Sequence, residues 1–394
     1  VRVQPGVVLD HLNRAVAKHD LIFGPDVATA NRATIGGMIG NNSAGARSVM
    51  YRQTVDHVRS LKTVLSDGTT VEFGPNTPKE FGRKCELRTR EGDAYRTASS
   101  IAAAHADEIE RRFPKIVRKV SGYDLTRPGN SLVPLIVGSE GTLAVVAEAE
   151  LALVPRPKFR GLLVPHFASM RSALDAVAAC LELGPSAVEL MDRMLIDLAR
   201  EQRALKRTMA AVAGRPAALL MAEFSADSQA EVDDRVAKLA RKLAGIPGLT
   251  ACVTATDPEL RDPLWNLRSA AVPLLYGMTG DRKPVTFVED CAVDPGRVPE
   301  FADRFREVLN RHGTDGAFYG HASVGCLHIR PVLNLHDPAD VTKMRAIMAD
   351  VSDLVLAFGG SLSGEHGDGL VRSEWNEKMF GPVIYEAFRR VKRA

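Results

Sequence analysis

Residues 361–369 place a glutamate, a histidine and three glycines in one short segment. Before it, apolar residues recur at three- and four-residue steps from Val341 to Phe358, which predicts an amphipathic helix that ends at the following glycines. Glycine allows backbone angles closed to other residues and lets a ligand approach the main chain. The chain must therefore fold so that a packed helix holds this loop, and we expect Glu365 and His366 to face a site. An ordinary glycine-rich surface turn is the alternative.

A second segment, residues 320–330, carries two histidines, His321 and His328, after an apolar run. Their odd separation would put them on opposite faces of a straight strand, but a bend at Gly325 would turn both toward one centre. Two imidazoles and the Glu365 carboxylate make a three-ligand site for a divalent ion, with a position open for substrate. Two unrelated histidines on a half-buried pair of strands are the alternative interpretation.

Two glycine-rich turns also stand out. Residues 33–47 combine glycines, asparagines and hydroxyl side chains, so main-chain N–H groups could face a phosphate or a polar ring edge. Their spacing is not the dinucleotide fingerprint, and a nicotinamide fold is not indicated. The run 135–146 predicts a strand, a glycine-rich turn and a strand, and residues 55–73 predict a hairpin around Asp67 and Gly68. A purely structural cluster of turns is the alternative for residues 33–47.

The length of 394 residues favours two domains. The composition changes at residues 155–157, with two prolines, which we interpret as a domain boundary. Beyond it, predicted strands precede amphipathic helices, a pattern typical of an α+β domain with helices on one mainly antiparallel sheet. These predicted strands cover residues 161–165, 217–224 and 285–288. Within this part, a predicted loop at 263–268 presents Arg268, which could hold a substrate carboxylate or form an ordinary surface salt bridge.

Composition narrows the classes of function. The 51 basic and 48 acidic residues are well mixed, which argues against a nucleic-acid-binding surface. No apolar run reaches the length of a membrane-spanning helix. The five cysteines are scattered without a Cys-x-x-Cys pair, so neither an iron–sulfur cluster nor a disulfide framework is indicated within this chain. A reducing compartment, and therefore the cytoplasm, is the expectation.

Four separated motifs, at residues 34–45, 137–143, 320–328 and 363–367, together resemble the FAD-linked D-2-hydroxy-acid dehydrogenases. This group includes D-lactate, glycolate and D-2-hydroxyglutarate dehydrogenases. The wording of the motifs is most similar to a long bacterial form in which a C-terminal iron–sulfur half follows the flavin half. Members also carry an upstream pyrophosphate loop and a downstream Asn-Pro-Gly-Lys stretch that this sequence lacks, so we expect an internal fragment.

The resemblance implies an α+β fold: a partial FAD-binding domain of the vanillyl-alcohol-oxidase type with a ferredoxin-like α+β cap. It places FAD-binding sequence in residues 1–155 and a substrate or cap domain in residues 156–335. Residues 336–394 would return to the FAD domain and carry the active-site loop. The implied reaction is oxidation of a D-2-hydroxy acid, of D-2-hydroxyglutarate or D-lactate type, with hydride transfer to flavin.

Residue by residue, the resemblance suggests His321, His328 and Glu365 as ligands of zinc or manganese, His366 as the catalytic base and Arg268 as the clamp of the substrate carboxylate. Arg330 is a second candidate clamp. The implied FAD contacts are Thr34, Gly36, Gly37, Asn41, Asn42, Ser43, Gly45, Gly138, Gly141, Thr142 and Val145.

The implied partners are a 2-hydroxy acid and an electron acceptor, either an iron–sulfur domain, a quinone or an electron-transfer protein. No nucleic acid is expected, and a homodimer is left open. An iron–sulfur cluster is expected only outside this chain, and association with the inner face of the membrane stays an option. A flavin-free metal hydrolase and an inactive fragment that only binds a partner are the alternatives from other classes. An oxygen-using oxidase is the alternative within the enzyme class.

Overall fold

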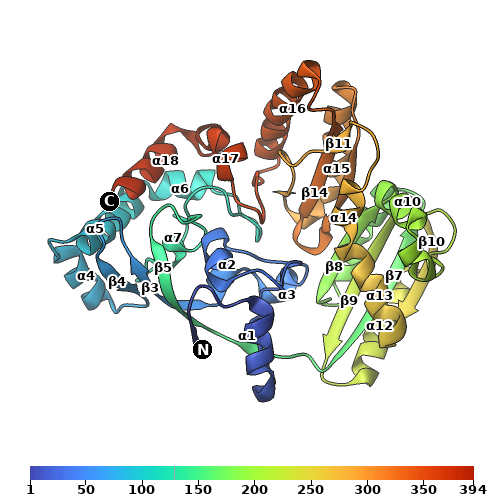
Figure 1. Cartoon of the computed structure of the whole chain (residues 1–394), viewed down its shortest axis with the longest axis horizontal. Helices are drawn as coiled ribbons and strands as arrows, with labels where there is room; N and C mark the ends of the chain where they lie inside the picture. Colours follow the sequence, from blue (N-terminus) through green and yellow to red (C-terminus); the bar gives the residue numbers. More distant parts are fainter. Residues whose placement is uncertain (128) are drawn as a thin grey trace.

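The computed structural model describes residues 1–127 and 129–394. Figure 1 shows two lobes, the first around a small sheet on the left and the second around a larger sheet on the right. The small sheet is antiparallel throughout and has the strand order β1-β5-β3-β4. These strands are β1 (Arg2–Val3), β3 (Val58–Val64), β4 (Thr70–Phe73) and β5 (Val145–Leu151). The predicted hairpin over 55–73 is therefore confirmed as β3 and β4.

The helices of the first lobe come from both ends of the chain, because the last two pack against the N-terminal part (Figure 1). A short pair of strands, β2 (Leu21–Ile22) and β6 (Val154–Pro155), lies where the chain leaves this lobe. The helices are α1 (Leu9–Val16), α2 (Ile35–Asn41), α3 (Ser48–Tyr51), α4 (Pro78–Glu86), α5 (Arg90–Ala104), α6 (Ala106–Arg112), α7 (Val133–Ile136), α17 (Gly369–Arg372) and α18 (Asn376–Arg393).

The second lobe is built on an eight-stranded sheet whose pairs are all antiparallel. Seven strands follow one another across the sheet, and the eighth, β12, pairs with β14. In order across the sheet, its strands are β10 (Leu249–Ala255), β7 (Phe159–Phe167), β9 (Ala218–Ala226), β8 (Ala187–Asp192), β13 (Gly316–His321), β14 (Cys326–Leu333) and β11 (Lys283–Pro284), with β12 at Cys291–Ala292. The expected α+β pattern with a mainly antiparallel sheet is thus observed.

Helices cover both faces of this sheet, because alternate strand residues enter two different cores. Leu163 and Leu220 pack into one core and Leu162 and Leu219 into the other. The first core takes α8 (Met170–Asp175), α9 (Val177–Leu181), α12 (Gln229–Leu243), α15 (Val298–Arg311) and α16 (Pro338–Ala357). The second takes α10 (Arg193–Glu201), α11 (Lys206–Met209), α13 (Pro258–Ser269) and α14 (Ala271–Tyr276). The 3-10 turns are η1 (Ala17–His19), η2 (Thr54–Asp56), η3 (Arg203–Leu205), η4 (Pro295–Arg297), η5 (Ala322–Val324) and η6 (Ser373–Trp375).

Local sequence explains where α16 begins and ends. The Asp337 side chain accepts a hydrogen bond from the Ala339 N–H, and Pro338 occupies the first turn, where its missing N–H costs nothing. Gly359 follows the helix with a left-handed φ of 63°, a conformation that glycine adopts without strain. The predicted helix before the 361–369 loop is confirmed.

Three local predictions were wrong. Leu135 and Ile136 belong to the helical turn α7 rather than to a strand. Pro134 suits the first turn of a helix, and a short apolar run alone does not distinguish a helix from a strand. Residues 263–268 lie inside α13, where burial of Leu264 and Leu267 on one face outweighs the internal proline. Residues 285–288 form no strand and instead connect β11 to β12.

Segment 361–363 joins the two lobes. On one side Ser361 exchanges backbone hydrogen bonds with Ala292 of β12, at 2.8 and 3.0 Å. On the other side the Val120 N–H donates to the Ser363 carbonyl at 3.0 Å, and the Ser363 N–H donates to the Ser121 hydroxyl at 3.2 Å. The loop that follows is therefore presented between the lobes. No helix in the described ranges is long and apolar enough to cross a membrane.

Candidate active site

The β13–β14 hairpin brings the two histidines together. Gly325 has a φ of 71°, and a Cβ there would lie 1.9 Å from the Val293 carbonyl oxygen, so the tight turn requires glycine. The register pairs His321 with Cys326 and Tyr319 with His328. As a result, the Nε2 atoms of His321 and His328 lie 3.4 Å apart. The sequence analysis placed the bend correctly, although the structure makes it a hairpin rather than a bent single strand.

Glu365 reaches the same point from the 361–369 loop. Its Oε2 lies 3.0 Å from the Nε2 of His321 and 3.7 Å from the Nε2 of His328. Arg118 of the first lobe, which is fully buried, contacts the same oxygen at 2.6 Å. Burial raises the pKa of a carboxyl group, but the charges of Arg118 and His321 outweigh it and hold the pKa of Glu365 well below its usual value. Glu365 is thus ionised.

These three side chains fit a divalent metal ion. Their ligand atoms are separated by 3.0, 3.4 and 3.7 Å. A tetrahedral ion with bonds of about 2.0–2.1 Å separates its ligands by about 3.3 Å, so only small movements would be needed. His328 is held neutral, as a ligand must be, because burial and then the neighbouring imidazoles lower its pKa well below the usual value.

Glu189 completes this group from the neighbouring strand β8. The Nδ1 of His321 lies 2.9 and 3.1 Å from its two carboxylate oxygens. A carboxylate on the far nitrogen of a metal-binding histidine fixes the ring and directs the other nitrogen to the metal. Burial lowers the pKa of His321, but Glu189 and then Glu365 outweigh it, so the net shift is upward.

His366 lies beside this cluster, stacked on His328 with ring centroids 5.0 Å apart and an interplanar angle of 15°. Its Nδ1 is 3.0 Å from the Glu289 Oε1 and 3.8 Å from the Asp290 Oδ1. Burial opposes the charged imidazolium, but Asp290, and then the hydrogen bond to Glu289, raise the pKa of His366 to about 9. About a third of its side chain, 35%, is exposed. His366 therefore has one anchored nitrogen and an accessible ring.

The two arginines flank the histidines, and each is paired with a buried carboxylate. The Nε of Arg268 lies 2.9 Å from Glu189, and the Nη2 of Arg330 lies 2.8 Å from Glu289. Both guanidinium groups lie over the ring of Tyr319, at 4.9 and 5.7 Å from its centroid. Arg268 is thus part of the cluster as the sequence suggested, although it comes from a helix rather than a loop.

The two glycine-rich turns lie side by side and touch the 361–369 loop. The Gly138 N–H donates to the Ile39 carbonyl at 2.9 Å, and the Glu140 N–H donates to the Gly40 carbonyl at 2.7 Å. Glu140 in turn accepts a hydrogen bond from the Gly369 N–H at 3.0 Å. The predicted cofactor turns therefore lie next to the residues that follow His366.

The predicted FAD contacts do not all share one surface. Gly138 and Thr142 line a cavity of about 650 Å³ whose far side is formed by α17 and α18. This volume lies in the range of cofactor pockets, so the turn at 138–142 fits a bound flavin nucleotide. Gly141 has a left-handed φ and no atom within 4 Å of its added Cβ, which leaves its backbone open to a ligand.

The remaining predicted contacts lie around α2 or on β5. Thr34 caps α2 by accepting a hydrogen bond from the Gly37 N–H, and Asn41, Asn42 and Ser43 form the end of that helix. Gly36 and Gly45 are close to protein atoms: an added Cβ would meet Pro5 at 2.6 Å and the Asp26 carbonyl oxygen at 1.3 Å. Val145 is 67% exposed on β5. Their role in FAD binding stays a prediction.

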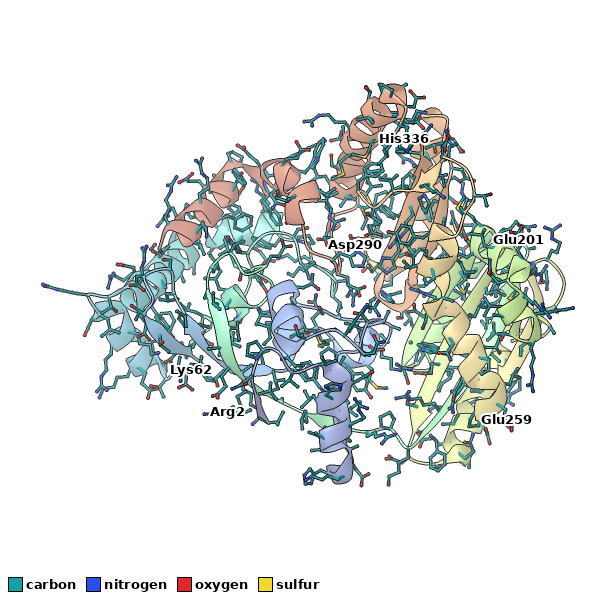
Figure 2. All side chains as sticks on the ribbon, in the orientation of Figure 1. Arg2, Lys62, Glu201, Glu259, Asp290 and His336 are labelled. Atoms are coloured by element: carbon teal, nitrogen blue, oxygen red, sulfur yellow. The ribbon has the colours of Figure 1, made fainter. Side chains whose placement is uncertain are left out.

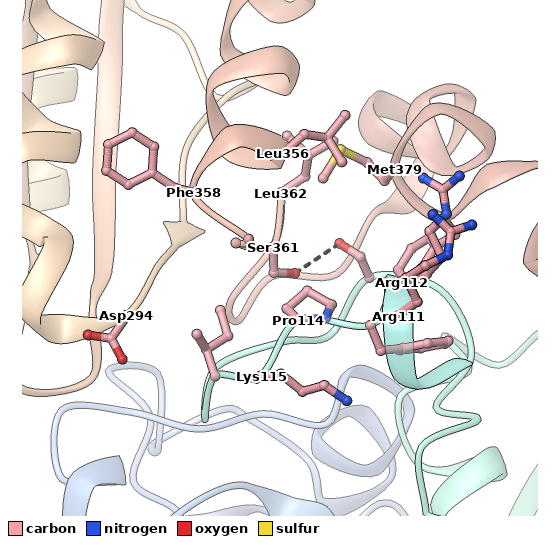
Figure 3. A pocket seen from close by; sticks show the side chains of 16 residues that line it. Arg111, Arg112, Pro114, Lys115, Asp294, Leu356, Phe358, Ser361, Leu362 and Met379 are labelled. Carbon is pink, nitrogen blue, oxygen red and sulfur yellow. Dashed lines mark hydrogen bonds between the residues drawn. The ribbon is translucent and has the colours of Figure 1, made fainter. Parts of the chain in front are cut away.

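A second cavity, of about 470 Å³, lies between the lobes at segment 359–362 (Figure 3). The Ser361 hydroxyl donates to the Ser121 hydroxyl across it at 3.4 Å. Arg111, Arg112 and Lys115 lie on its first-lobe side. All three are paired with Glu108 or Glu110, so the cavity offers little free charge.

Sequence reasoning missed the four charged residues that surround the histidines. These are Arg118, Glu189, Glu289 and Asp290. A signal existed for Glu189, because a carboxylate between the apolar residues Val188 and Leu190 of β8 must be paired when buried. Glu289 and Asp290 directly follow the segment 285–288 that was predicted as a strand, and nothing in the sequence around them indicates a role. Nothing local distinguishes Arg118 from a surface arginine.

Comparison with known proteins identifies the family of this chain. Residues 156–394 match the family described as FAD linked oxidases, C-terminal domain, and residues 1–74 match an FAD binding domain. The D-2-hydroxyglutarate dehydrogenases of Pantoea ananatis and Escherichia coli are 32% and 33% identical over the whole of this chain, which spans 40% of their length. The D-lactate dehydrogenase of Archaeoglobus fulgidus is 28% identical over 98% of this chain and 72% of its own.

Solved structures show the same fold. A p-cresol methylhydroxylase has a TM-score of 0.65 at 12% identity and covers 100% of this chain and 73% of its own. A 4-ethylphenol oxidase from Gulosibacter chungangensis has a TM-score of 0.64 at 13% identity, covering 99% and 73%. The expected α+β fold, of the vanillyl-alcohol-oxidase type with a cap, is confirmed.

Proposed function

The chain belongs to the FAD-linked oxidases, and from that premise we propose that it serves the FAD-dependent oxidation of a D-2-hydroxy acid to the 2-oxo acid. One observation carries the proposal: the His321, His328 and Glu365 ligand atoms converge beside His366 and two arginines, next to the turn at 138–142. The names of the relatives, D-2-hydroxyglutarate and D-lactate dehydrogenases, support this substrate class.

His321, His328 and Glu365 would hold a divalent ion, zinc or manganese. When bound there, the ion supplies a Lewis acid that favours loss of the hydroxyl proton of the substrate. Glu189 orients the ring of His321, and Arg118 neutralises Glu365 when no ion is present. The His366 ring stacks on His328, one of the three ligands, with centroids 5.0 Å apart, so a substrate hydroxyl on the ion would lie near this ring.

His366 is the candidate general base. Its Nδ1 is held by Glu289, so Nε2 is the atom that would accept the hydroxyl proton. The pKa of about 9 means that most of the metal-free protein carries the imidazolium at neutral pH. A neighbouring dication favours the neutral imidazole, so the metal ligands and the base act together. Glu289 then stabilises the charge that the ring gains.

Arg268 and Arg330 would hold the substrate carboxylate. Each keeps N–H donors beyond those used on Glu189 and Glu289, and an arginine binds a carboxylate through two parallel hydrogen bonds. Holding the carboxylate at a fixed place orients the carbon that loses hydride. The buried carboxylates behind them keep both guanidinium groups in place before substrate arrives.

FAD would be held by the turns at 34–45 and 138–142, and it supplies the acceptor for the hydride. In this assignment residues 1–155 and 359–394 form the flavin-binding part and residues 156–358 the cap. The boundary predicted at residue 336 is moved because α16 packs against α15 and β14 of the second lobe. Electrons would pass on to an iron–sulfur domain, a quinone or an electron-transfer protein. Membership of a flavin-oxidase family favours oxidation over flavin-free hydrolysis by the same metal ligands.

The test is an anaerobic titration of the flavin absorbance of the FAD-loaded protein with D- and L-2-hydroxyglutarate and D- and L-lactate. Bleaching by a D-acid alone supports the proposal and identifies the substrate. Bleaching by none of the four acids would rule out the proposed substrate class. A colourless protein that cleaves esters only when metal is added would favour the hydrolase.

A further inference from the structure

Asp290 accepts four hydrogen bonds from the 361–369 loop. Its Oδ2 accepts from the Ser363 hydroxyl at 2.7 Å, the Glu365 N–H at 2.9 Å and the His366 N–H at 2.8 Å. Its main-chain carbonyl accepts from the Gly364 N–H at 2.8 Å. Four consecutive residues of the loop thus donate to one residue.

The backbone of Asp290 makes this possible. Its φ of 60° is left-handed, a conformation that aspartate and asparagine tolerate better than other residues with a side chain. This geometry turns the carbonyl and the carboxylate toward the same loop. Asp290 is fully buried between the lobes, near the centre of the molecule (Figure 2). A buried carboxylate needs such donors, so the loop and Asp290 stabilise each other.

Neighbouring residues pack closely around the 361–369 loop and fix its backbone. A Cβ on Gly364 would lie 2.8 Å from the Cys326 sulfur and 3.0 Å from the Ala292 Cβ. Arg372 places Nη1 3.3 Å from the Asp290 Oδ1 and donates through Nε to the Gly367 carbonyl at 3.1 Å. Residues 363–367 are therefore held at every position, with Asp290 as the common partner.

We propose that Asp290 is the positioning residue of the active site. Its carboxylate holds the backbone of the metal ligand Glu365 and of the base His366 in a fixed position relative to each other. The inference rests on the proposed function for the roles of those two residues. It follows from the contacts because the Glu365 and His366 N–H groups share one acceptor oxygen. Glu365 then extends to the histidine pair, while His366 extends to Glu289.

Asp290→Asn is the sharpest variant, because asparagine keeps the left-handed backbone and one acceptor oxygen. Its NH₂ group must face either the loop N–H groups or Arg372, so the charge-assisted bonds are lost. Asp290→Ala removes them all. The matched control is Asp340→Asn, another buried carboxylate that accepts a backbone N–H and pairs with Arg282. It follows His336, which Figure 2 places at the outer end of the second lobe.

Two measurements on the full 394-residue chain decide the inference. Hydrogen exchange of the peptide covering 363–367, without metal, should be at least about tenfold faster in Asp290→Asn and unchanged in Asp340→Asn. Cobalt titration, followed by visible absorption, should show that Asp290→Asn binds cobalt about 10–100-fold more weakly than wild type. The spectrum of its cobalt complex should resemble that of a Glu365→Gln variant, in which one metal ligand is lost.

Wild-type exchange and a wild-type cobalt spectrum in both Asp290 variants would overturn the inference. Faster exchange spread equally over the whole chain would also overturn it, because Asp290 would then be a general stabilising residue. If the wild-type protein binds no cobalt, the proposed metal site fails, and the exchange measurement still decides the role of Asp290.

Discussion

Replacing Glu189 by glutamine should weaken metal binding at the histidine pair. Glu189 is fully buried and contacts both the Nδ1 of His321 and the Nε of Arg268. Glutamine keeps the shape and can still accept the Nδ1–H, but it removes the negative charge. Arg268 then becomes an uncompensated cation beside the site, and the imidazole of His321 becomes a weaker donor to a metal.

Loss of a carboxylate behind a metal-binding histidine lowers metal affinity by about 10–100-fold. At 1.36 kcal/mol for each factor of ten, this corresponds to about 1.4–2.7 kcal/mol. One effect opposes it. Glu189 raises the pKa of His321, so in part of the wild-type protein the metal must displace a proton from this imidazole. Competition between proton and metal is weaker in the variant, because the pKa of His321 is lower there. The competition acts below the raised pKa and vanishes above it. The affinity difference should therefore be larger at pH 8.5 than at pH 6.

Zinc competition against a chromophoric chelator at both pH values measures this difference. The matched control is Glu223→Gln, which removes another buried carboxylate from an arginine, Arg47, without touching a metal ligand. It should leave the zinc affinity unchanged. Equal affinities of wild type and Glu189→Gln at pH 8.5 would refute the assigned role of Glu189.

Three further outcomes are expected. Arg118→Met leaves the Glu365 carboxylate without its buried arginine partner, so it should lower the free energy of unfolding by about 3–5 kcal/mol without zinc. The loss should be smaller with zinc bound; urea titrations that give the same loss with and without zinc would contradict this. Zinc binding at pH 6.5 should release about half a proton or more, because Glu189 and Glu365 raise the pKa of His321 above 6.5 despite its burial; calorimetric enthalpies that do not depend on the buffer would be against it. Glu223→Gln should cost about 1.5–3 kcal/mol of stability, because it removes one carboxylate from the largely buried Arg47, which stays paired with Asp26. A loss below about 1 kcal/mol would make this equivalent to an ordinary surface pair.

Local sequence patterns predicted the parts of the site that depend on local structure. The apolar period from Val341 to Phe358 predicted α16, and Gly359 marked its end. Gly325 predicted the bend that brings His321 and His328 together, because no other residue fits that turn. In each case the cause lies within a few residues of its effect.

Contacts between distant segments could not be predicted in this way. His321 and Glu189 are separated by 132 positions and meet only because β13 pairs with β8 in one register. Arg118 reaches Glu365 from 247 positions away. A one-residue shift in strand register would send either histidine to the other face, and the sequence alone does not fix that register.

Glycine content was an ambiguous guide to cofactor contacts. Gly45 was predicted to face FAD, yet its closest approach is to the backbone of Asp26, while Gly141 has open space around it. Glycine is favoured at both positions for a general reason: either a neighbouring group comes close to the main chain, or the backbone is left-handed. Sequence cannot tell whether that neighbour is a ligand or another part of the chain.

The rate of anaerobic flavin reduction by the reactive D-2-hydroxy acid, in wild type and in His366→Gln, tests the central claim most directly. Both proteins must carry equal FAD and equal metal. Because His366 would take the hydroxyl proton, its replacement should slow the reduction by about 10²–10⁴-fold and leave substrate binding nearly unchanged. An unaltered rate would contradict the account of this site.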